Sequence, residues 1–198
     1  EGKLLGLISP HAGYAYSGQV AAYAYAQLRG LTFTKVVVVS PVHQVYPGQF
    51  GTTDKDNFET PLGLVPVDQA LLKHMERHVR VNHVSQDGEH SLEIQLPFLQ
   101  LTLGSFSLLP IMMGDQDKKS AAELGVALAQ VIGKEPVLLV ASTDLSHFHP
   151  YGAAVHLDQE LVRHIVAMDA EGLARAVESD QCEACGAGPV MAVMAAGP

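Results

Sequence analysis

The feature that most constrains the fold is a set of four short apolar runs, rich in β-branched residues and without polar alternation. They cover residues 4–8, 35–40, 106–112 and 137–142. Strands of this kind are typical of sheets that are covered on both faces. Segments with helical periodicity separate them, as in α/β proteins whose parallel strands are joined by right-handed crossovers. The sequence therefore predicts an α/β fold, a mostly parallel sheet with helices on both faces.

The intervening segments carry apolar residues at helical spacing. Ser120 and Glu123 have the spacing of a capping box and predict one helix start. Segment 44–67 lacks a helical period and contains turn residues, so we expect one or two short strands there. The predicted helices cover residues 18–28, 68–78, 91–103 (interrupted at Pro97), 120–132, 156–168, 169–178 and 185–195, and a short strand covers 81–84.

Composition excludes several classes of protein. The 198 residues, 47% hydrophobic and 17% charged, suffice for a core, and we expect a single domain over residues 1–198. A doubly wound domain returns to its sheet after the last helix, so we also expect that a C-terminal strand region is lacking. The apolar runs are far below the ~20 residues that span a bilayer, and no membrane segment is expected. The net charge of −9 disfavours a nucleic-acid partner. The two cysteines form no disulfide framework, which predicts a cytoplasmic location.

Histidines follow three of the predicted strands: His11 the first, His43 the second and His147 the fourth. The carboxyl ends of parallel strands meet at one edge of a sheet, where ligands bind, so the imidazoles can meet if these strands are neighbours. Adjacent strands lie ~4.8 Å apart and a metal–imidazole bond is ~2.1 Å long. His11 and His43 can therefore share one metal ion.

A third ligand is expected from Cys185, because a helix begins just after it and a helix N-terminus favours the thiolate. Neutral His147 can take a proton from a substrate hydroxyl, and Asp144 can orient a ligand imidazole or bind the metal. Cys182 completes a C-x-x-C pattern with Cys185, but no second such pair exists, and Cys182 is interpreted as incidental.

Four further residues are candidates for the surroundings of this site. His90 and Glu93 lie three residues apart at a helix start, so they either pair behind the ligands or form a local cap. Tyr14 and Tyr16 follow His11 and are expected to line the pocket. The motifs of serine hydrolases (G-x-S-x-G), P-loop proteins and dinucleotide-binding proteins (G-x-G-x-x-G) do not occur, so these classes lose their main support.

Seven short blocks stand out along nearly the whole chain. They are PHAGY at 10–14, YSG at 16–18, SPVH at 40–43, TPLG at 60–63, EHSLEIQLPF at 89–98, STDLSH at 142–147 and ACG at 184–186. In this order the blocks resemble the Memo family, in particular the prokaryotic members called AmmeMemoRadiSam system protein B. The run EHSLEIQLPF is hard to place in any other family.

The resemblance implies an α/β fold similar to class III extradiol dioxygenases, which bind non-heme Fe(II) through two histidines and a glutamate and use another histidine as base. Carried over, His11 and His43 match the metal histidines and His147 matches the base. Cys185 stands where Memo proteins have a cysteine, and Asp144 belongs to the same Memo motif as His147. The implied cofactor is Fe(II), with Cu or Zn as alternatives. A thiolate is softer than a carboxylate and can be oxidised, so dioxygen ring cleavage does not carry over.

The function predicted first is that of a metal-dependent oxidoreductase acting on an unknown small molecule or peptide. One alternative is a zinc-type hydrolase that uses the same ligands to lower the pKa of water, although no glutamate adjoins a ligand histidine as in H-E-x-x-H. The other is a non-catalytic module whose former enzyme pocket holds a peptide or protein. The resemblance also implies a functional link to a radical-SAM protein.

Overall fold

The computed structural model describes residue 4 and residues 6–86 and 88–197. Its centre is a six-stranded sheet in the order β1-β8-β2-β7-β3-β6, and a separate two-stranded sheet is formed by β4 and β5. The strands are β1 (Gly6–Ser9), β2 (Lys35–Pro41), β3 (Phe50–Thr53), β4 (Asn57–Thr60), β5 (Gly63–Pro66), β6 (Asn82–Val84), β7 (Ser107–Met113) and β8 (Val137–Ser142).

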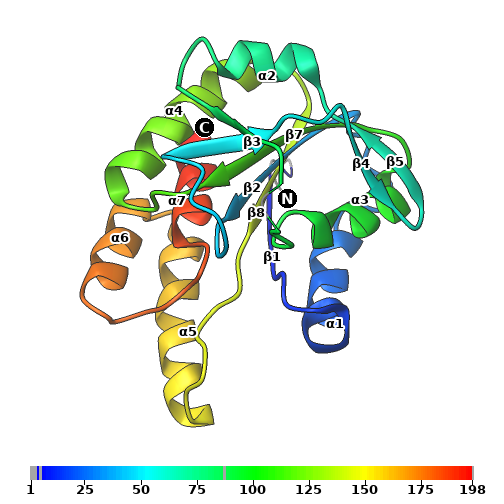
Figure 1. The fold of residues 1–198 in the computed structure, drawn as a ribbon. Coiled ribbons are helices and arrows are strands. Elements are labelled where there is room, and N and C mark those ends of the chain that lie inside the picture. Colours follow the sequence, from blue (N-terminus) through cyan, green and yellow to red (C-terminus); the bar gives the residue numbers. More distant parts are fainter. Residues whose placement is uncertain (1–3, 5, 87, 198) are drawn as a thin grey trace.

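Four neighbouring strands, β1, β8, β2 and β7, are parallel to one another. β3 pairs antiparallel with β7, and β6 pairs parallel with β3. The prediction of a mostly parallel α/β sheet is therefore confirmed, with one reversal of direction near an edge (Figure 1). Segment 44–67 forms three short strands, β3, β4 and β5, where one or two were predicted.

Helices cover both faces of the large sheet, as predicted (Figure 1). The helices are α1 (Tyr14–Ala26), α2 (Gln69–Met75), the 3₁₀ helix η1 (Glu93–Gln95), α3 (Leu96–Leu103), α4 (Lys118–Ile132), α5 (Tyr151–Val166), α6 (Ala170–Glu178) and α7 (Ala187–Ala196). In the part of the chain that the structure describes, none of them is long and apolar enough to cross a membrane.

The central strands β2, β7 and β8 contribute to two cores, because successive side chains point to opposite faces of a sheet. In β2, Val37 and Val39 pack with residues of α2, α4 and α7. Val36 and Val38 pack with residues of α1 and α3 on the other face. All four valines are completely buried. This two-sided burial is the physical reason that β2 reads as an unbroken apolar run.

Three predicted helix starts were wrong, because each of these helices begins before the predicted residue. α1 begins four residues earlier than predicted, at Tyr14, and Ser17 lies inside it. α4 begins after Asp117, whose carboxylate accepts hydrogen bonds from two main-chain N–H groups, so the capping-box prediction at Ser120 was wrong. α5 begins at Tyr151 rather than at residue 156.

Pro97 does not interrupt a helix. It stands in the first turn of α3, directly after η1, where its missing N–H costs no hydrogen bond. The segment predicted as one helix over 91–103 is therefore the short η1 followed by α3.

Candidate metal centre

The candidate site lies at the carboxyl edge of the large sheet. His11 follows β1 and His43 follows β2, but these strands are not adjacent, because β8 lies between them. The imidazoles nevertheless meet, with ring centroids 5.3 Å apart. One ligand atom each of His11, His43 and Cys185 lies within 4.8 Å of the other two. The structure thus brings together the three residues that the sequence predicted as metal ligands.

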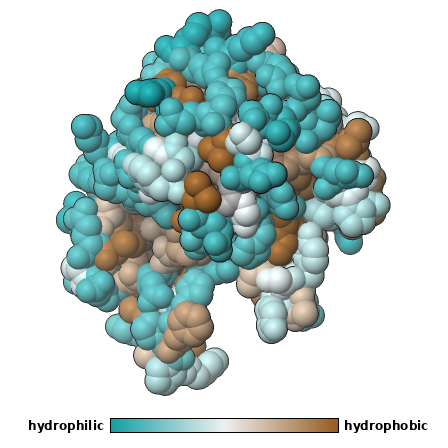
Figure 2. Space-filling model, viewed as in Figure 1, coloured by the Kyte–Doolittle hydropathy of each residue, from teal (hydrophilic) through white to brown (hydrophobic). Residues whose placement is uncertain are grey.

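On the face shown in Figure 2, the surface is hollowed between two projections. Comparison with Figure 1 places the start of α1 in one projection and the start of α5 in the other. These helices follow β1 and β8, so the hollow lies beside the edge of the sheet that carries the candidate site.

His11 is almost completely buried and has a partner on each ring nitrogen. Nδ1 lies 2.9 Å from Ser142 Oγ, and Nε2 lies 3.3 Å from Cys185 Sγ and 3.6 Å from Asp144 Oδ2. The other oxygen of Asp144 accepts hydrogen bonds from the main-chain N–H groups of His11 and Ala12, at 2.9 and 3.2 Å. Asp144 therefore holds the loop after β1 against the end of β8.

His43 is held by a residue that the sequence analysis missed, Glu89. The Glu89 carboxylate is buried, accepts a hydrogen bond from the His43 main chain at 2.5 Å, and lies 3.0 Å from His43 Nδ1. Burial alone would raise the pKa of Glu89, but the hydrogen bonds from His43 outweigh it and lower this pKa. A carboxylate behind an imidazole fixes the ring and leaves Nε2 for a metal. Two features of the sequence could have identified Glu89: its acidic side chain and its place directly before His90.

Cys185 lies two residues before α7 and is tied to the end of β8. Its Sγ accepts a hydrogen bond from Asp144 N at 3.2 Å, and the next residue, Gly186, donates from its N–H to Thr143 Oγ1 at 2.9 Å. Burial, together with the Asp144 carboxylate, raises the pKa of the Cys185 thiol. The prediction that the helix start lowers this pKa was therefore wrong. A metal that binds here must displace the thiol proton, which makes its affinity fall at low pH.

Asp144 and His147 adjoin the same sulfur. One ligand atom each of Asp144, His147 and Cys185 forms a second group within 4.8 Å. The main-chain N–H of His147 donates to Glu183 Oε1 at 3.0 Å, and His147 Nδ1 lies 3.7 Å from the same oxygen. His147 is thus placed beside the proposed ligands, and its role as acid or base stays a prediction.

The four residues predicted around the site lie in two segments, the start of α1 and the segment that leads into η1. Tyr14 donates its hydroxyl proton to the Ile94 carbonyl at 3.2 Å, while Tyr16 is 87% exposed. The His90 ring lies 6.3 Å from the His11 ring, and Glu93 opens η1. Their roles, as pocket lining for the tyrosines and as a supporting pair for His90 and Glu93, stay predictions.

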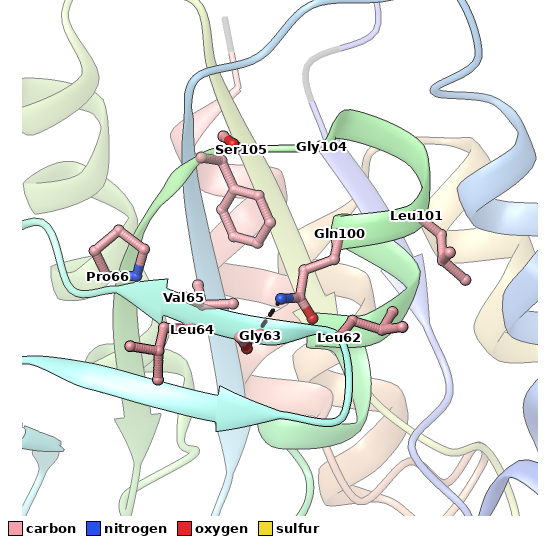
Figure 3. Close-up of a pocket in the computed structure, with 10 residues that line it drawn as sticks. Leu62, Gly63, Leu64, Val65, Pro66, Gln100, Leu101, Gly104 and Ser105 are labelled. Carbon is pink, nitrogen blue, oxygen red and sulfur yellow. Dashed lines mark hydrogen bonds between the residues drawn. The ribbon is translucent and has the colours of Figure 1, made fainter.

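A separate groove of about 470 Å³ lies between β5 and the end of α3 (Figure 3). The side-chain amide of Gln100 crosses it and donates to the Gly63 carbonyl at 3.2 Å. The residues that line it include apolar side chains such as Leu62 and Leu101 but no acid, base or thiol. It therefore lacks the groups that acid–base or metal chemistry needs.

Burial lowers the pKa of His11 to about 4. The negative charge of Asp144 acts to raise this pKa, whereas His43 and His90 lower it further. The unfolded chain, with a pKa near the usual 6.5, binds the proton first as pH falls. Neutral His11 therefore contributes fully to the free energy of unfolding above pH ~6.5. This contribution is lost as pH falls towards ~4, by about 3 kcal/mol in total.

We expect urea unfolding of metal-free protein to show that the free energy of unfolding falls over this pH range. In His11→Gln the part of this decrease that comes from His11 should be absent. The exposed His156→Gln should keep the wild-type pH dependence; an unchanged profile in His11→Gln would contradict the assignment.

Fold and site together define a class: an α/β protein with two histidines and a cysteine at the carboxyl edge of a mostly parallel sheet. A family model described as "Memo-like protein" matches residues 1–197. The chain belongs to the Memo family.

Curated relatives agree with this assignment. A MEMO1 family protein of Methanococcoides burtonii is 39% identical over 199 residues, which cover 98% of this chain and 74% of the relative. MEMO1 family protein Mbar_A1422 of Methanosarcina barkeri is 36% identical over 201 residues, which cover 99% of this chain and 74% of the relative. A Thermotoga maritima relative is 35% identical, with 96% and 70% covered.

A solved structure shares the fold. The uncharacterized protein JW3007 from Escherichia coli K12 superposes with a TM-score of 0.69, over 98% of this chain and 89% of that one. The sequences are 14% identical, so the likeness concerns the fold alone.

Proposed function

We propose that this chain is a metal-dependent oxidoreductase whose metal is held by His11, His43 and Cys185. The observation that carries the proposal is the convergence of two imidazoles and one thiol within 4.8 Å. The three residues come from segments that follow β1, follow β2 and precede α7, so tertiary structure assembles them.

The donor set fits a transition metal. Nδ1 of His11 faces Ser142 and Nδ1 of His43 faces Glu89, so each ring has Nε2 left for a metal. His11 Nε2 lies 3.3 Å from Cys185 Sγ, close to the separation of two donors on one ion at bond lengths of ~2.1 and ~2.3 Å. Because burial lowers the pKa of His11 to about 4, its ring is neutral at neutral pH.

Imidazole and thiolate ligands suit iron, copper and zinc. We assign Fe(II) as the physiological metal, with copper or zinc as other outcomes of the test. When bound, iron or copper supplies electron transfer and a position for substrate, whereas zinc does not change its oxidation state.

The remaining site residues supply acid–base chemistry and orientation in this proposal. His147 holds or takes a proton at its imidazole, and its side chain, 38% exposed, can exchange that proton with solvent. Asp144 keeps the loop after β1 in place through its Oδ1 contacts. Glu89 holds the ring of His43.

The test is reversible redox cycling. Protein loaded anaerobically with Fe(II) is oxidised with ferricyanide and reduced with ascorbate, and the iron is followed by electron paramagnetic resonance. We expect the iron to stay bound through several cycles in wild type and in His83→Ala, and to be lost in Cys185→Ser. Loss of iron from wild type in the first cycle would contradict the proposal. Zinc retention with hydrolysis of p-nitrophenyl acetate would favour the hydrolase instead.

A further inference from the structure

A buried chain of hydrogen bonds lies behind the imidazole of His11. Tyr25 donates its hydroxyl proton to Gln95 Oε1 at 2.7 Å. Gln95 Nε2 donates to the Pro10 carbonyl at 3.0 Å and to Ser142 Oγ at 2.8 Å. Because a carbonyl oxygen can only accept, the Pro10 contact fixes which end of the Gln95 amide is the nitrogen. Tyr25, Gln95 and Ser142 are almost completely buried, so water does not compete for these bonds.

The hydroxyl of Ser142 offers one proton and two lone pairs. It donates its proton to the Ser91 carbonyl at 2.6 Å and accepts from Gln95. The remaining neighbour is His11 Nδ1, at 2.9 Å. Since the hydroxyl proton is already used, this contact is a hydrogen bond only if Nδ1 carries a proton. The lone pair of the neutral ring then lies on Nε2, 3.3 Å from Cys185 Sγ.

We propose that Ser142, held by Gln95, is a positioning residue that sets the tautomer of His11. The opposite tautomer would leave two acceptors facing each other in a buried site, which is unfavourable because neither has a proton to share. Ser142 thereby directs the His11 lone pair towards Cys185 before any metal arrives. The inference rests on the proposed function only where Nε2 is taken to bind a metal; the tautomer itself is a property of the metal-free protein.

The structure offers a matched control. Ser40 is the last residue but one of the neighbouring strand β2, and Ser142 is the last residue of β8. Each directly follows the paired residues Val39 and Ala141, and both serines are completely buried. The hydroxyl of Ser40 has no hydrogen-bond partner among the described residues. Ser40→Ala therefore removes a buried hydroxyl from an equivalent position without touching the His11 ring.

The test is ¹⁵N NMR of the His11 ring in metal-free protein at neutral pH. We expect wild type, Ser40→Ala and Ser142→Thr, which keeps the hydroxyl, to show Nδ1 protonated. Ser142→Ala should show a mixture of tautomers. A wild-type ring protonated at Nε2, or a Ser142→Ala ring identical to wild type, would overturn the proposal. The wild-type spectrum decides even where Ser142→Ala does not fold.

A second arm separates this inference from the proposed function. We expect Ser142→Ala to bind Zn²⁺, used as probe, about tenfold to a hundredfold more weakly than wild type, with Ser40→Ala unchanged. Equal affinity in Ser142→Ala and wild type would overturn the role of Ser142 in metal binding. If wild type binds no Zn²⁺ or Fe(II) while the tautomers behave as expected, the proposed function fails and the positioning of His11 by Ser142 stands.

Discussion

Replacement of His43 by alanine is expected to reduce bound metal from about one ion per chain to less than about a tenth of an ion, because a site with three protein ligands loses one of them. The same result is expected for His11→Ala and Cys185→Ser. The measurement is metal analysis of protein loaded anaerobically with Fe(II) and desalted. Unchanged metal content in His43→Ala would contradict the assignment of the ligands.

The chain contains a matched control for this experiment. His83 Nε2 lies 2.7 Å from the Glu76 carboxylate at the surface, as His43 Nδ1 lies 3.0 Å from Glu89 at the site. His83→Ala should therefore leave the metal content unchanged. Glu89→Gln should weaken metal binding about tenfold to a hundredfold, because the carboxylate holds the ligand imidazole, whereas Glu76→Gln should have no effect.

Replacement of Gly186 by alanine is expected to destabilise the protein by about 3 kcal/mol and to weaken metal binding. A Cβ at this position would lie 2.3 Å from the Ser142 carbonyl oxygen and 2.7 Å from Thr143 Cβ. The carbonyl belongs to the main chain and cannot move aside at low cost. The segment before α7 must therefore shift away from β8, and it carries Cys185 with it.

Urea unfolding of metal-free protein and a Zn²⁺ titration measure the two effects. Gly152→Ala is the control, because nothing lies within 4 Å of a Cβ built there in α5. Alanine has the higher helix propensity, so this variant should be as stable as wild type or slightly more stable. A midpoint in Gly186→Ala equal to that of wild type would show that the close approach of these segments is unimportant.

Much of the fold could be predicted because its signals are local. Apolar runs such as 35–40 have no polar side, so they have to be covered on both faces, and the helices between them leave few topologies. The starts of helices were less predictable. Asp117 and Ser120 are both good capping residues, and only the folded chain shows that the Asp117 carboxylate caps α4.

Burial of single side chains was also beyond local signals. His164 stands in a helix at a position that reads as surface, yet it is 5% exposed and lies 3.2 Å from Asp169. The start of α6 covers it, since a Cβ at Gly172 would lie 2.6 Å from its Nδ1. Whether such a side chain is buried depends on contacts between elements, which the periodicity within one helix does not reveal.

The sequence by itself determined the type of sheet and which residues follow its strands, because both can be read from short-range patterns. Residues that follow parallel strands lie at one edge of the sheet. On this basis the sequence identified His11 and His43 as candidates, and it identified Cys185 because this residue directly precedes a predicted helix. Only the tertiary structure decided that β8 lies between β1 and β2, and that Glu89 and Ser142 stand behind the two imidazoles. The two contacts join residues that are 46 and 131 positions apart in the chain. Like the order of the strands, they depend on how whole elements pack.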